Sequence, residues 1–382
     1  MESTLLDMNE NENKMSSPKI CFFNRSSIHY RKNIYMLMDK ELPCDFYFGD
    51  SRPGGIKPVP YELFAHFKGE LHNINFGPFY WQKGALRLLK QYTDFITPGE
   101  YYCISTWVIL LLARMKKKNV YLWTHGAYGD ETGFRKWIAM MSKKLAKGVF
   151  LYGNYAKDIL LKWGIPADKM YIIYNSLSYD EQLPLRNSIQ PSELYKEHFK
   201  NDNGNIVFIG RLTAVKKLDQ ILKAVKQLKE EGLQLNVTFI GDGVMRAQLE
   251  SLTTEFGLQD TVWFYGALYD ERKIAEFLYN ADLCVSPGNV GLTAMHAMTF
   301  GCPVISHDNF PLQMPEFEAI ESGNTGAFFK ENDMDSLVNA IKNWMANCVD
   351  REVVRKACYQ VIDEKYNPHV QIETIRTAIN NQ

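Results

Sequence analysis

The sequence predicts an α/β protein built from two doubly wound parallel-sheet domains that face each other across a cleft. Short apolar runs typical of buried strands alternate with apolar positions at helical spacing along most of the chain. The alternation restarts near Gly204, after a polar stretch over residues 187–203. The length of 382 residues suits two domains of ordinary size. Alternating strands and helices form parallel sheets, which bind ligands beyond the carboxyl ends of their strands.

The first predicted domain spans residues 18–185, and a linker over residues 186–203 follows it. Apolar runs predict strands at Ile20–Phe23, Phe46–Phe48, Tyr101–Ile104, Val120–Trp123, Gly148–Tyr152 and Met170–Tyr174. Helical spacing predicts helices at Ile34–Leu42, Trp107–Lys117, Arg135–Ala146 and Ala156–Trp163. Residues 1–17 are polar and have no apolar core, which predicts a disordered tail rather than a signal peptide.

The second predicted domain spans residues 204–365. Its strands are predicted at Ile206–Ile209, Asn236–Ile240, Val262–Tyr265, Leu283–Ser286 and Pro303–Ser306. Its helices are predicted at Lys217–Glu230, Met245–Phe256, Glu271–Asn280, Leu292–Phe300 and Met334–Asn347. Residues 366–382 are expected to form a C-terminal helix, and the sequence leaves open whether this helix crosses back to the first domain.

The composition excludes several classes of protein. Hydrophobic residues make up 46% and charged residues 23% of the chain, which is typical of a globular protein. The net charge of −1 argues against nucleic acid as a partner. Seven cysteines without a Cys-x-x-Cys pair predict neither a disulfide framework nor a zinc site, and they fit a reducing cytoplasm. The longest apolar stretch, residues 107–113, is too short to span a bilayer.

Positive charge is concentrated in the first half of the chain. Lys and Arg outnumber Asp and Glu over residues 18–180, whereas the acidic residues are in excess after them. Tryptophans lie among these basic residues at positions 81, 107 and 137. Two interpretations stay open: a surface that rests on anionic lipid at the inner face of the cell membrane, or an ordinary solvated face.

The strongest chemical signal is the segment Gly210-Arg211-Leu212 followed by Lys216. It leaves a predicted strand and opens a predicted helix, so both cations are expected at the carboxyl end of the sheet. Two fixed cations suit a diphosphate, whose charge grows as it becomes a leaving group. The alternative is a surface arginine beside a lysine at a helix start.

A second signal follows the strand that is predicted to end at Ser286. A loop containing Gly288 leads to a helix that begins near Gly291, whose backbone amides can receive phosphate or sugar oxygens. Thr293 lies in the first turn and offers a hydroxyl. Gly301 and Pro303 end the helix and begin the next strand.

With these residues in place, the segment 205–345 resembles the donor-binding domain of glycosyltransferase family 4, whose members have the GT-B fold. The phosphate segment matches, and so do three further landmarks in the same order: Phe239-Ile240-Gly241-Asp242-Gly243, Phe264-Tyr265-Gly266-Ala267 and Ala281-Asp282-Leu283. The resemblance continues more weakly upstream, in Trp123-Thr124-His125-Gly126 and in Gly164-Ile165-Pro166. Taken together, the match covers most of the chain.

The resemblance implies roles for individual residues. Arg211 and Lys216 would bind the donor diphosphate, and His125 would approach the donor sugar. The remaining donor-binding positions that it implies are Gly210, Gly241, Tyr265, Ala267, Leu268, Asn289, Val290, Gly291, Leu292 and Thr293, with the nucleotide base held near Tyr265 to Leu268. A purely structural role at a strand end is the alternative for His125.

The sequence departs from the family where members usually have two glutamates, one for the donor sugar and one for the ribose. Gly288 and His296 stand at these positions. Gly288 offers no side chain, whereas His296 either hydrogen-bonds the ribose or packs in the core beside Leu292 and Met295. This departure bears on donor identity more than on the class of reaction, because transfer with retention in this family is thought to need no protein nucleophile.

Three further residues are candidates. Glu316 falls where the family often has a Pro-Glu pair, so it either replaces the missing sugar contact or lies in a surface loop. His29 and Arg31 follow the first strand and either line the acceptor side or belong to a solvated loop. No His, Cys, Asp or Glu spacing typical of a metal site is present, so we expect metal-independent transfer without a cofactor.

The sequence therefore predicts a metal-independent, retaining glycosyltransferase of the hexosyltransferase type. Its donor would be a UDP- or GDP-linked sugar, and its acceptor a saccharide or lipid-linked saccharide in the synthesis of a cell-surface polysaccharide or lipid-linked oligosaccharide. Two alternatives remain: a sugar-nucleotide epimerase of similar fold, and a non-catalytic nucleotide-sugar-binding partner of another transferase. The missing glutamates favour the second alternative, and Arg211 and Lys216 oppose it.

Overall fold

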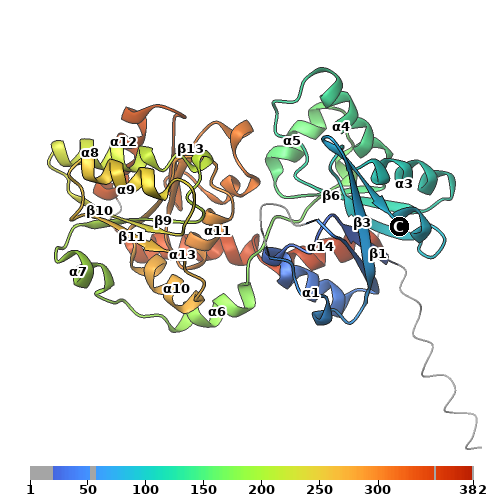
Figure 1. Cartoon of the computed structure of the whole chain (residues 1–382), viewed down its shortest axis with the longest axis horizontal. Helices are drawn as coiled ribbons and strands as arrows, with labels where there is room; N and C mark the ends of the chain where they lie inside the picture. Colours follow the sequence, from blue (N-terminus) through green and yellow to red (C-terminus); the bar gives the residue numbers. More distant parts are fainter. Residues whose placement is uncertain (1–19, 52–56, 348–349, 381–382) are drawn as a thin grey trace, which may run out of the picture. The chain divides into compact units, whose positions relative to one another are not determined.

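The computed structural model describes residues 20–51, 57–347 and 350–380 (Figure 1). The predicted disordered tail, residues 1–17, lies outside the described residues. The described chain contains two β-sheets, one of eight strands and one of six, with helices between most successive strands. Nearly all neighbouring strands run parallel, which confirms the predicted α/β architecture with two Rossmann-like sheets.

The eight-stranded sheet has the order β4-β3-β2-β1-β5-β6-β7-β8. Its strands are β1 (Ile20–Asn24), β2 (Cys44–Gly49), β3 (Phe67–Phe76), β4 (Phe79–Lys83), β5 (Asp94–Pro98), β6 (Asn119–Thr124), β7 (Gly148–Leu151) and β8 (Met170–Ile172). All five residues of β1 are buried, because this strand lies in the middle of the sheet with both faces covered. The helices of this region are α1 (Lys32–Glu41), α2 (Ala85–Leu88), α3 (Ile104–Met115), α4 (Gly133–Leu145) and α5 (Asn154–Lys162).

Two features of this sheet differ from the sequence prediction. The strand predicted at Tyr101–Ile104 is wrong: the strand is β5, and Ile104 begins α3. The aromatic pair Tyr101-Tyr102 resembles a strand, but Pro98-Gly99 has already ended the ladder, and Cys103 forms only an isolated bridge to Tyr80. The sequence prediction also missed the antiparallel hairpin of β3 and β4 at the sheet edge.

The six-stranded sheet has the order β11-β10-β9-β12-β13-β14. Its strands are β9 (Gly204–Ile209), β10 (Leu235–Ile240), β11 (Val262–Gly266), β12 (Leu283–Ser286), β13 (Val304–His307) and β14 (Gly326–Phe329), the last of which was not predicted. Chain order reverses direction beside β9, since β10 pairs on one side of it and β12 on the other. Such a reversal is where doubly wound sheets bind ligands.

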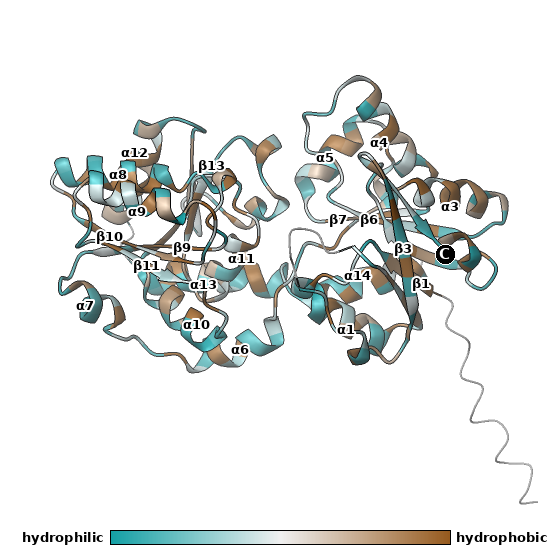
Figure 2. Cartoon of the chain, viewed as in Figure 1, coloured by the Kyte–Doolittle hydropathy of each residue, from teal (hydrophilic) through white to brown (hydrophobic). Residues whose placement is uncertain are grey.

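Two apolar clusters cover the two faces of this sheet. One face is packed by α8 (Asp219–Glu230), α9 (Arg246–Glu255) and α12 (Met334–Asn347), and the other by α10 (Glu271–Asn280), α11 (Leu292–Thr299) and α13 (Arg351–Glu364). Figure 1 shows these two groups of helices on opposite sides of the strands, and Figure 2 shows apolar residues concentrated in the strands between them. Burial of both faces explains why these strands read as continuous apolar runs.

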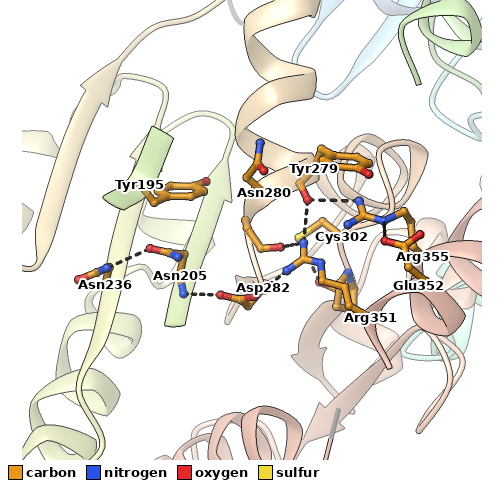
Figure 3. Close-up of polar contacts among 12 residues, drawn as sticks. Tyr195, Asn205, Asn236, Tyr279, Asn280, Asp282, Cys302, Arg351, Glu352 and Arg355 are labelled. Atoms are coloured by element: carbon orange, nitrogen blue, oxygen red, sulfur yellow. Dashed lines mark hydrogen bonds and ion pairs between the residues drawn. The ribbon is translucent and has the colours of Figure 1, made fainter. Parts of the chain in front are cut away.

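Polar side chains fasten α13 to the amino end of β12 (Figure 3). Asp282 accepts the backbone N–H of Asn205 at 2.7 Å and pairs with the Arg351 guanidinium at 2.6 Å. Arg351 also donates to the carbonyl oxygens of Tyr279 and Ala281. The Ala-Asp-Leu landmark of the sequence therefore has a structural explanation, because Asp282 joins the starts of β9 and β12 to the first turn of α13.

Contacts divide the chain into two compact units. One comprises the chain up to Trp123 with Met141–Val149, and the other comprises Thr124–Met140 with the chain from Phe150 onward. Two short helices, α6 (Tyr179–Ser188) and α7 (Leu194–Phe199), occupy much of the predicted linker. The final helix, α14 (Pro368–Asn380), packs against β8, and Gln371 donates to the carbonyl oxygen of Tyr174 at 3.0 Å. The domain boundaries given above stay a prediction.

Candidate functional site

Three glycines bring the carboxyl ends of β9, β10 and β11 close together. The Gly210 N–H donates to Ile240, and the Gly241 N–H donates to Gly266. A Cβ atom added at Gly241 would lie under 3.0 Å from the carbonyl oxygen of Gly210, and Gly241 has φ +141°, so a side chain is excluded on both grounds. The predicted donor-binding residues Gly210 and Gly241 thus shape the backbone from which Arg211 projects.

Arg211 and Lys216 lie near each other at this edge of the sheet, as the sequence predicted. Arg211 is exposed, whereas the Lys216 ammonium group is half-buried and donates to both the backbone oxygen and the side-chain oxygen of Asn289, at 2.6 and 3.0 Å. The pKa of Lys216 is lowered to about 8, mainly by burial; the Glu316 charge acts to raise it, and the Arg211 charge contributes to the lowering. A bound dianion would offset the burial of the Lys216 charge and its repulsion by Arg211.

Position 288 has no room for a side chain. A Cβ at this position would lie under 3.0 Å from the carbonyl oxygen of Val215 and from the backbone of Lys216. The Gly288 N–H donates to the Lys216 carbonyl at 3.0 Å, so the loop after β12 rests directly on the turn that carries Lys216. The backbone packing of this site therefore excludes a side chain at position 288.

Several residues at the start of α11 support the loop. Gly291 precedes the helix with φ +53°, and the Val290 N–H donates to Gln313 Oε1 at 2.8 Å. The Thr293 hydroxyl donates to the carbonyl of Ile209 at 2.9 Å and is buried, so it joins α11 to β9. Gln313 also donates to Ser306 and to the carbonyl of His307. Sequence reasoning missed Gln313, because nothing in its own neighbourhood marks it as a partner of a loop 23 residues away.

His296 belongs to a polar cluster that the sequence did not reveal. Its Nε2 lies 3.1 Å from Glu271 Oε2, and Gln182 Nε2 donates to the same oxygen at 3.1 Å. Burial acts to raise the pKa of Glu271, but the hydrogen bonds and the His296 charge outweigh it, so this pKa lies below its usual value. The side chains are 17% exposed at His296 and 32% at Glu271, so both are accessible. His296 is thus not enclosed by apolar residues alone.

The segment predicted to hold the base lies directly before Glu271. Tyr265 is the last residue but one of β11, and its ring lies against Phe277, at 4.8 Å between centroids, while Ala267 is exposed and Leu268 half-buried. Asp270 then accepts the N–H groups of the first turn of α10, which begins at Glu271. The base-binding candidates and the Glu271 carboxylate are therefore neighbours in the chain.

Glu316 and Glu318 have different surroundings from those expected. Glu316 is 3% exposed and accepts a hydrogen bond from Asn175 Nδ2 at 2.8 Å, so its interpretation as a surface-loop residue is wrong. The short helix at Pro315–Ala319 turns it inward. Glu318 accepts the first N–H groups of α5, those of Asn154 and Tyr155, at 2.7 Å each.

His125 follows β6 and lies in a small pocket. Its ring is 4.9 Å from that of Tyr152, and Tyr128, Tyr155, Phe310, Gln313 and Glu318 are among the other lining residues. Gln313 therefore lies beside His125 and also holds the loop before α11. Of the two acceptor-side candidates, His29 is exposed and Arg31 is half-buried over the ring of Trp123.

Within residues 20–51, 57–347 and 350–380, no three His, Cys, Asp or Glu side chains are grouped so that they could hold a metal ion. Metal independence stays a prediction. In the same part of the chain, none of the helices combines the length and the apolar character that crossing a bilayer requires.

In sequence, this chain is similar to known glycosyltransferases. Residues 191–361 match the sequence model of the family described as glycosyl transferases group 1. An uncharacterized glycosyltransferase of Methanocaldococcus jannaschii is 26% identical over 55% of this chain and 54% of its own length. The amylovoran biosynthesis glycosyltransferase AmsK of Erwinia amylovora is 25% identical over 55% of this chain and 50% of its own length. The chain thus matches about half the length of these curated relatives.

The structural likeness extends further than the sequence likeness. The crystal structure of HepE from Anabaena in complex with UDP superposes with a TM-score of 0.73, at 15% identity, over 95% of this chain and 100% of HepE. This likeness confirms the predicted GT-B fold.

Proposed function

We propose that this chain transfers a sugar from a nucleotide diphosphate donor to an acceptor hydroxyl, with retention of the anomeric configuration and without a metal ion. The observation that carries the proposal is the pair Arg211 and Lys216 at the carboxyl end of β9, beside Asn289 and the start of α11. This is the position where a doubly wound sheet binds nucleotides. The match of residues 191–361 to the group 1 glycosyltransferases supports it.

Catalysis would rest on stabilising the leaving diphosphate. As the glycosidic bond breaks, negative charge grows on the departing phosphate, and two fixed cations stabilise it more in the transition state than in the ground state. The leaving phosphate can accept the proton of the acceptor hydroxyl on the same face of the sugar, which gives retention. Gly288 supplies no carboxylate, so this route requires none at that position.

The donor is proposed to be a UDP-linked sugar. The similar structure of HepE contains UDP, which makes uridine the first nucleotide to test. Asn289, Lys216 and the start of α11 would contact the diphosphate and the sugar. The acceptor is proposed to be a saccharide or lipid-linked saccharide of a surface polysaccharide, a class that the name of the relative AmsK supports.

The ribose would be recognised by Glu271 and His296 together. An ionised carboxylate accepts hydrogen bonds from both ribose hydroxyls, and the lowered pKa of Glu271 keeps it ionised at neutral pH. His296 stands where relatives have the ribose glutamate, and Glu271 lies 3.1 Å from it. The carboxylate would thus come from α10 in place of α11.

Nucleotide release tests the proposal against its two alternatives. The protein is incubated with UDP- and GDP-linked hexoses, with and without saccharide acceptors, and released nucleoside diphosphate is measured. A transferase releases UDP slowly onto water and faster with an acceptor. A binding partner would shift the melting temperature without release, and an epimerase would convert the donor sugar without release.

Glu271→Gln is expected to weaken UDP binding about tenfold, since a hydrogen bond to a charged group contributes about 1.5–3 kcal/mol. The preference for UDP over 2′,3′-dideoxy-UDP should shrink by the same factor, because both hydroxyls lose their ionised partner. Calorimetric titration of both ligands measures this. The exposed Glu255→Gln on α9 is the control. An unchanged preference for the ribose hydroxyls would remove Glu271 from the ribose site.

UDP affinity is expected to fall as the pH rises through about 8, where Lys216 loses its proton in the free protein. Above that pKa, the protonated fraction falls tenfold per pH unit. Titrations from pH 6.5 to 9.5 measure the effect. Lys216→Arg should give a flatter profile, because arginine stays charged over this range. The free energy of unfolding should change with pH in the opposite direction. Between about pH 8 and pH 10.5 the unfolded chain holds a proton on Lys216 that the folded protein has lost, so the contribution of Lys216 to stability rises with pH in this range.

A further inference from the structure

The first turns of α4 expose two large aromatic side chains. Phe134 is 71% exposed and Trp137 is 52% exposed. Their rings stack on each other, with 5.8 Å between centroids and 13° between planes, so they form one continuous apolar surface. Single apolar residues are ordinary on a protein surface, whereas adjoining exposed rings usually mark a site of contact. This face of α4 departs from the normal pattern, because a surface helix turns polar side chains outward.

Basic side chains accompany the two rings. Arg135 and Lys136 lie between them in the sequence, and both are exposed. The Lys136 ammonium group lies over the ring of Trp163, 5.4 Å from its centroid, so it joins the start of α4 to the end of α5 (Figure 1). Aromatic and basic groups thus share one surface. We call it the α4 patch, and it consists of Phe134, Arg135, Lys136, Trp137 and Trp163.

Positive charge dominates on α4 itself. The 13 residues of this helix include four Lys or Arg and neither Asp nor Glu. One of the four, Lys143, is only 2% exposed, whereas the other three are exposed. Two acidic residues precede the helix. Asp130 is exposed, but Glu131 accepts two backbone N–H groups of its own loop, at 2.9 Å each. The surface around the rings is therefore basic as well as apolar.

The structure separates the three tryptophans that the sequence places among basic residues. Trp81 on β4 and Trp107 on α3 are half-buried, and Trp107 Nε1 donates to the Tyr101 carbonyl at 2.8 Å. Trp137, by contrast, is exposed. The sequence left open whether the basic region rests on anionic lipid or is an ordinary solvated face. Of these three positions, only 137 combines an exposed ring with exposed cations beside it.

We propose that the α4 patch binds the surface of an anionic lipid bilayer. Phe134 and Trp137 enter the boundary between headgroups and acyl chains, where aromatic rings are favoured. Arg135 and Lys136 pair with the phosphates of acidic lipids, whose surface charge attracts cations. This inference goes beyond the proposed function and does not depend on it.

Charge complementarity favours a lipid surface over a second copy of this chain. A symmetric dimer through the α4 patch would bring Arg135 and Lys136 of both copies together, and like charges at an interface repel. An anionic bilayer offers both an apolar layer for the rings and negative charge for the cations. Binding there would bring the protein close to an acceptor that is carried on a lipid.

Vesicle flotation tests the proposal directly, with phosphatidylcholine alone and with an equimolar mixture of phosphatidylcholine and phosphatidylglycerol. The wild type should bind the anionic vesicles at least tenfold more tightly than the neutral ones. Replacing both rings, Phe134→Ser with Trp137→Ser, should weaken binding to anionic vesicles at least tenfold. Phe76→Ser is the matched control, because this ring is 56% exposed on β3 outside the patch. Absence of wild-type binding, or an equal loss in the control, would overturn the inference.

Two further variants separate the roles of charge and of insertion. Arg135→Gln with Lys136→Gln should reduce the preference for anionic vesicles at least fivefold, whereas the exposed pair Lys40→Gln with Lys356→Gln should leave it unchanged. Brominated lipids quench the fluorescence of tryptophans that enter the bilayer. Trp137→Phe keeps an apolar ring and should lose most of the quenching seen in the wild type. Unchanged quenching would mean that another surface meets the lipid, which contradicts the proposal.

The melting temperature shows whether each variant folds, and Trp137→Phe decides the question if the double serine variant does not. Light scattering gives the oligomeric state. A wild-type dimer that Phe134→Ser with Trp137→Ser dissociates, without vesicle binding, would mean that a second copy covers the patch, and it would overturn the proposal. Vesicle binding by a protein that releases no nucleoside diphosphate would overturn only the proposed function.

Discussion

Arg211→Ala is expected to reduce the turnover of the nucleotide sugar at least a hundredfold. The Arg211 guanidinium is exposed at the carboxyl end of the six-stranded sheet and acts on the charge of Lys216 beside it. Charge that develops on the leaving diphosphate is stabilised by fixed cations, and a hundredfold loss corresponds to about 3 kcal/mol of transition-state stabilisation. The rate of nucleoside diphosphate release at saturating donor measures the effect.

The effects of Arg211→Ala on UDP affinity and on kcat are expected to differ. If Arg211 contacts the diphosphate in both states, UDP affinity falls as well, but kcat falls more than the affinity does. Arg87→Ala, on the exposed surface of α2, is the control and should leave both quantities unchanged. Near-normal turnover in Arg211→Ala would reject the assigned role. A hundredfold rise in KM with kcat unchanged would make Arg211 a binding residue only.

The sequence predicted the elements whose physical cause is local. β1 and β9 are buried on both faces, so their apolar runs are continuous and easy to recognise. The cations Arg211 and Lys216 are five residues apart and leave the same strand, so their proximity follows from the chain itself. The resemblance singled out Gly288 as a departure from the family, but its close contact with the Val215 and Lys216 backbone appears only in the structure.

The parts that were missed depend on contacts between distant segments. Glu271 of α10 meets His296, Gln182 of α6 donates to Glu271, and no spacing in the sequence connects the three. Gln313 reaches the loop before α11 in the same way. The hairpin of β3 and β4 was overlooked because it lies at the sheet edge, where β3 mixes exposed and buried residues and has no continuous apolar run.

Gly288→Glu is expected to weaken UDP binding at least tenfold. The new Cβ would lie under 3.0 Å from the Val215 carbonyl and from the Lys216 backbone, so the turn that presents Lys216 must move. The Lys216 ammonium would then lose its position against Asn289. The added carboxylate would also repel the diphosphate. Titration with UDP measures the loss.

Gly288→Ala separates the two causes, because it introduces the Cβ without the charge. If backbone contact dominates, alanine already produces most of the loss, and glutamate adds little. Gly257→Ala is the control: that glycine has φ +64° with nothing within 4 Å of an added Cβ, so it should cost about 1 kcal/mol of stability and leave UDP affinity unchanged. A gain in affinity with Gly288→Glu would show that the loop can move, and the close backbone contact would then not require glycine at this position. If alanine reduces UDP affinity as much as glutamate does, the turn carrying Lys216 and the loop after β12 form one packed unit. The position of the Lys216 ammonium group then depends on the absence of a side chain at position 288.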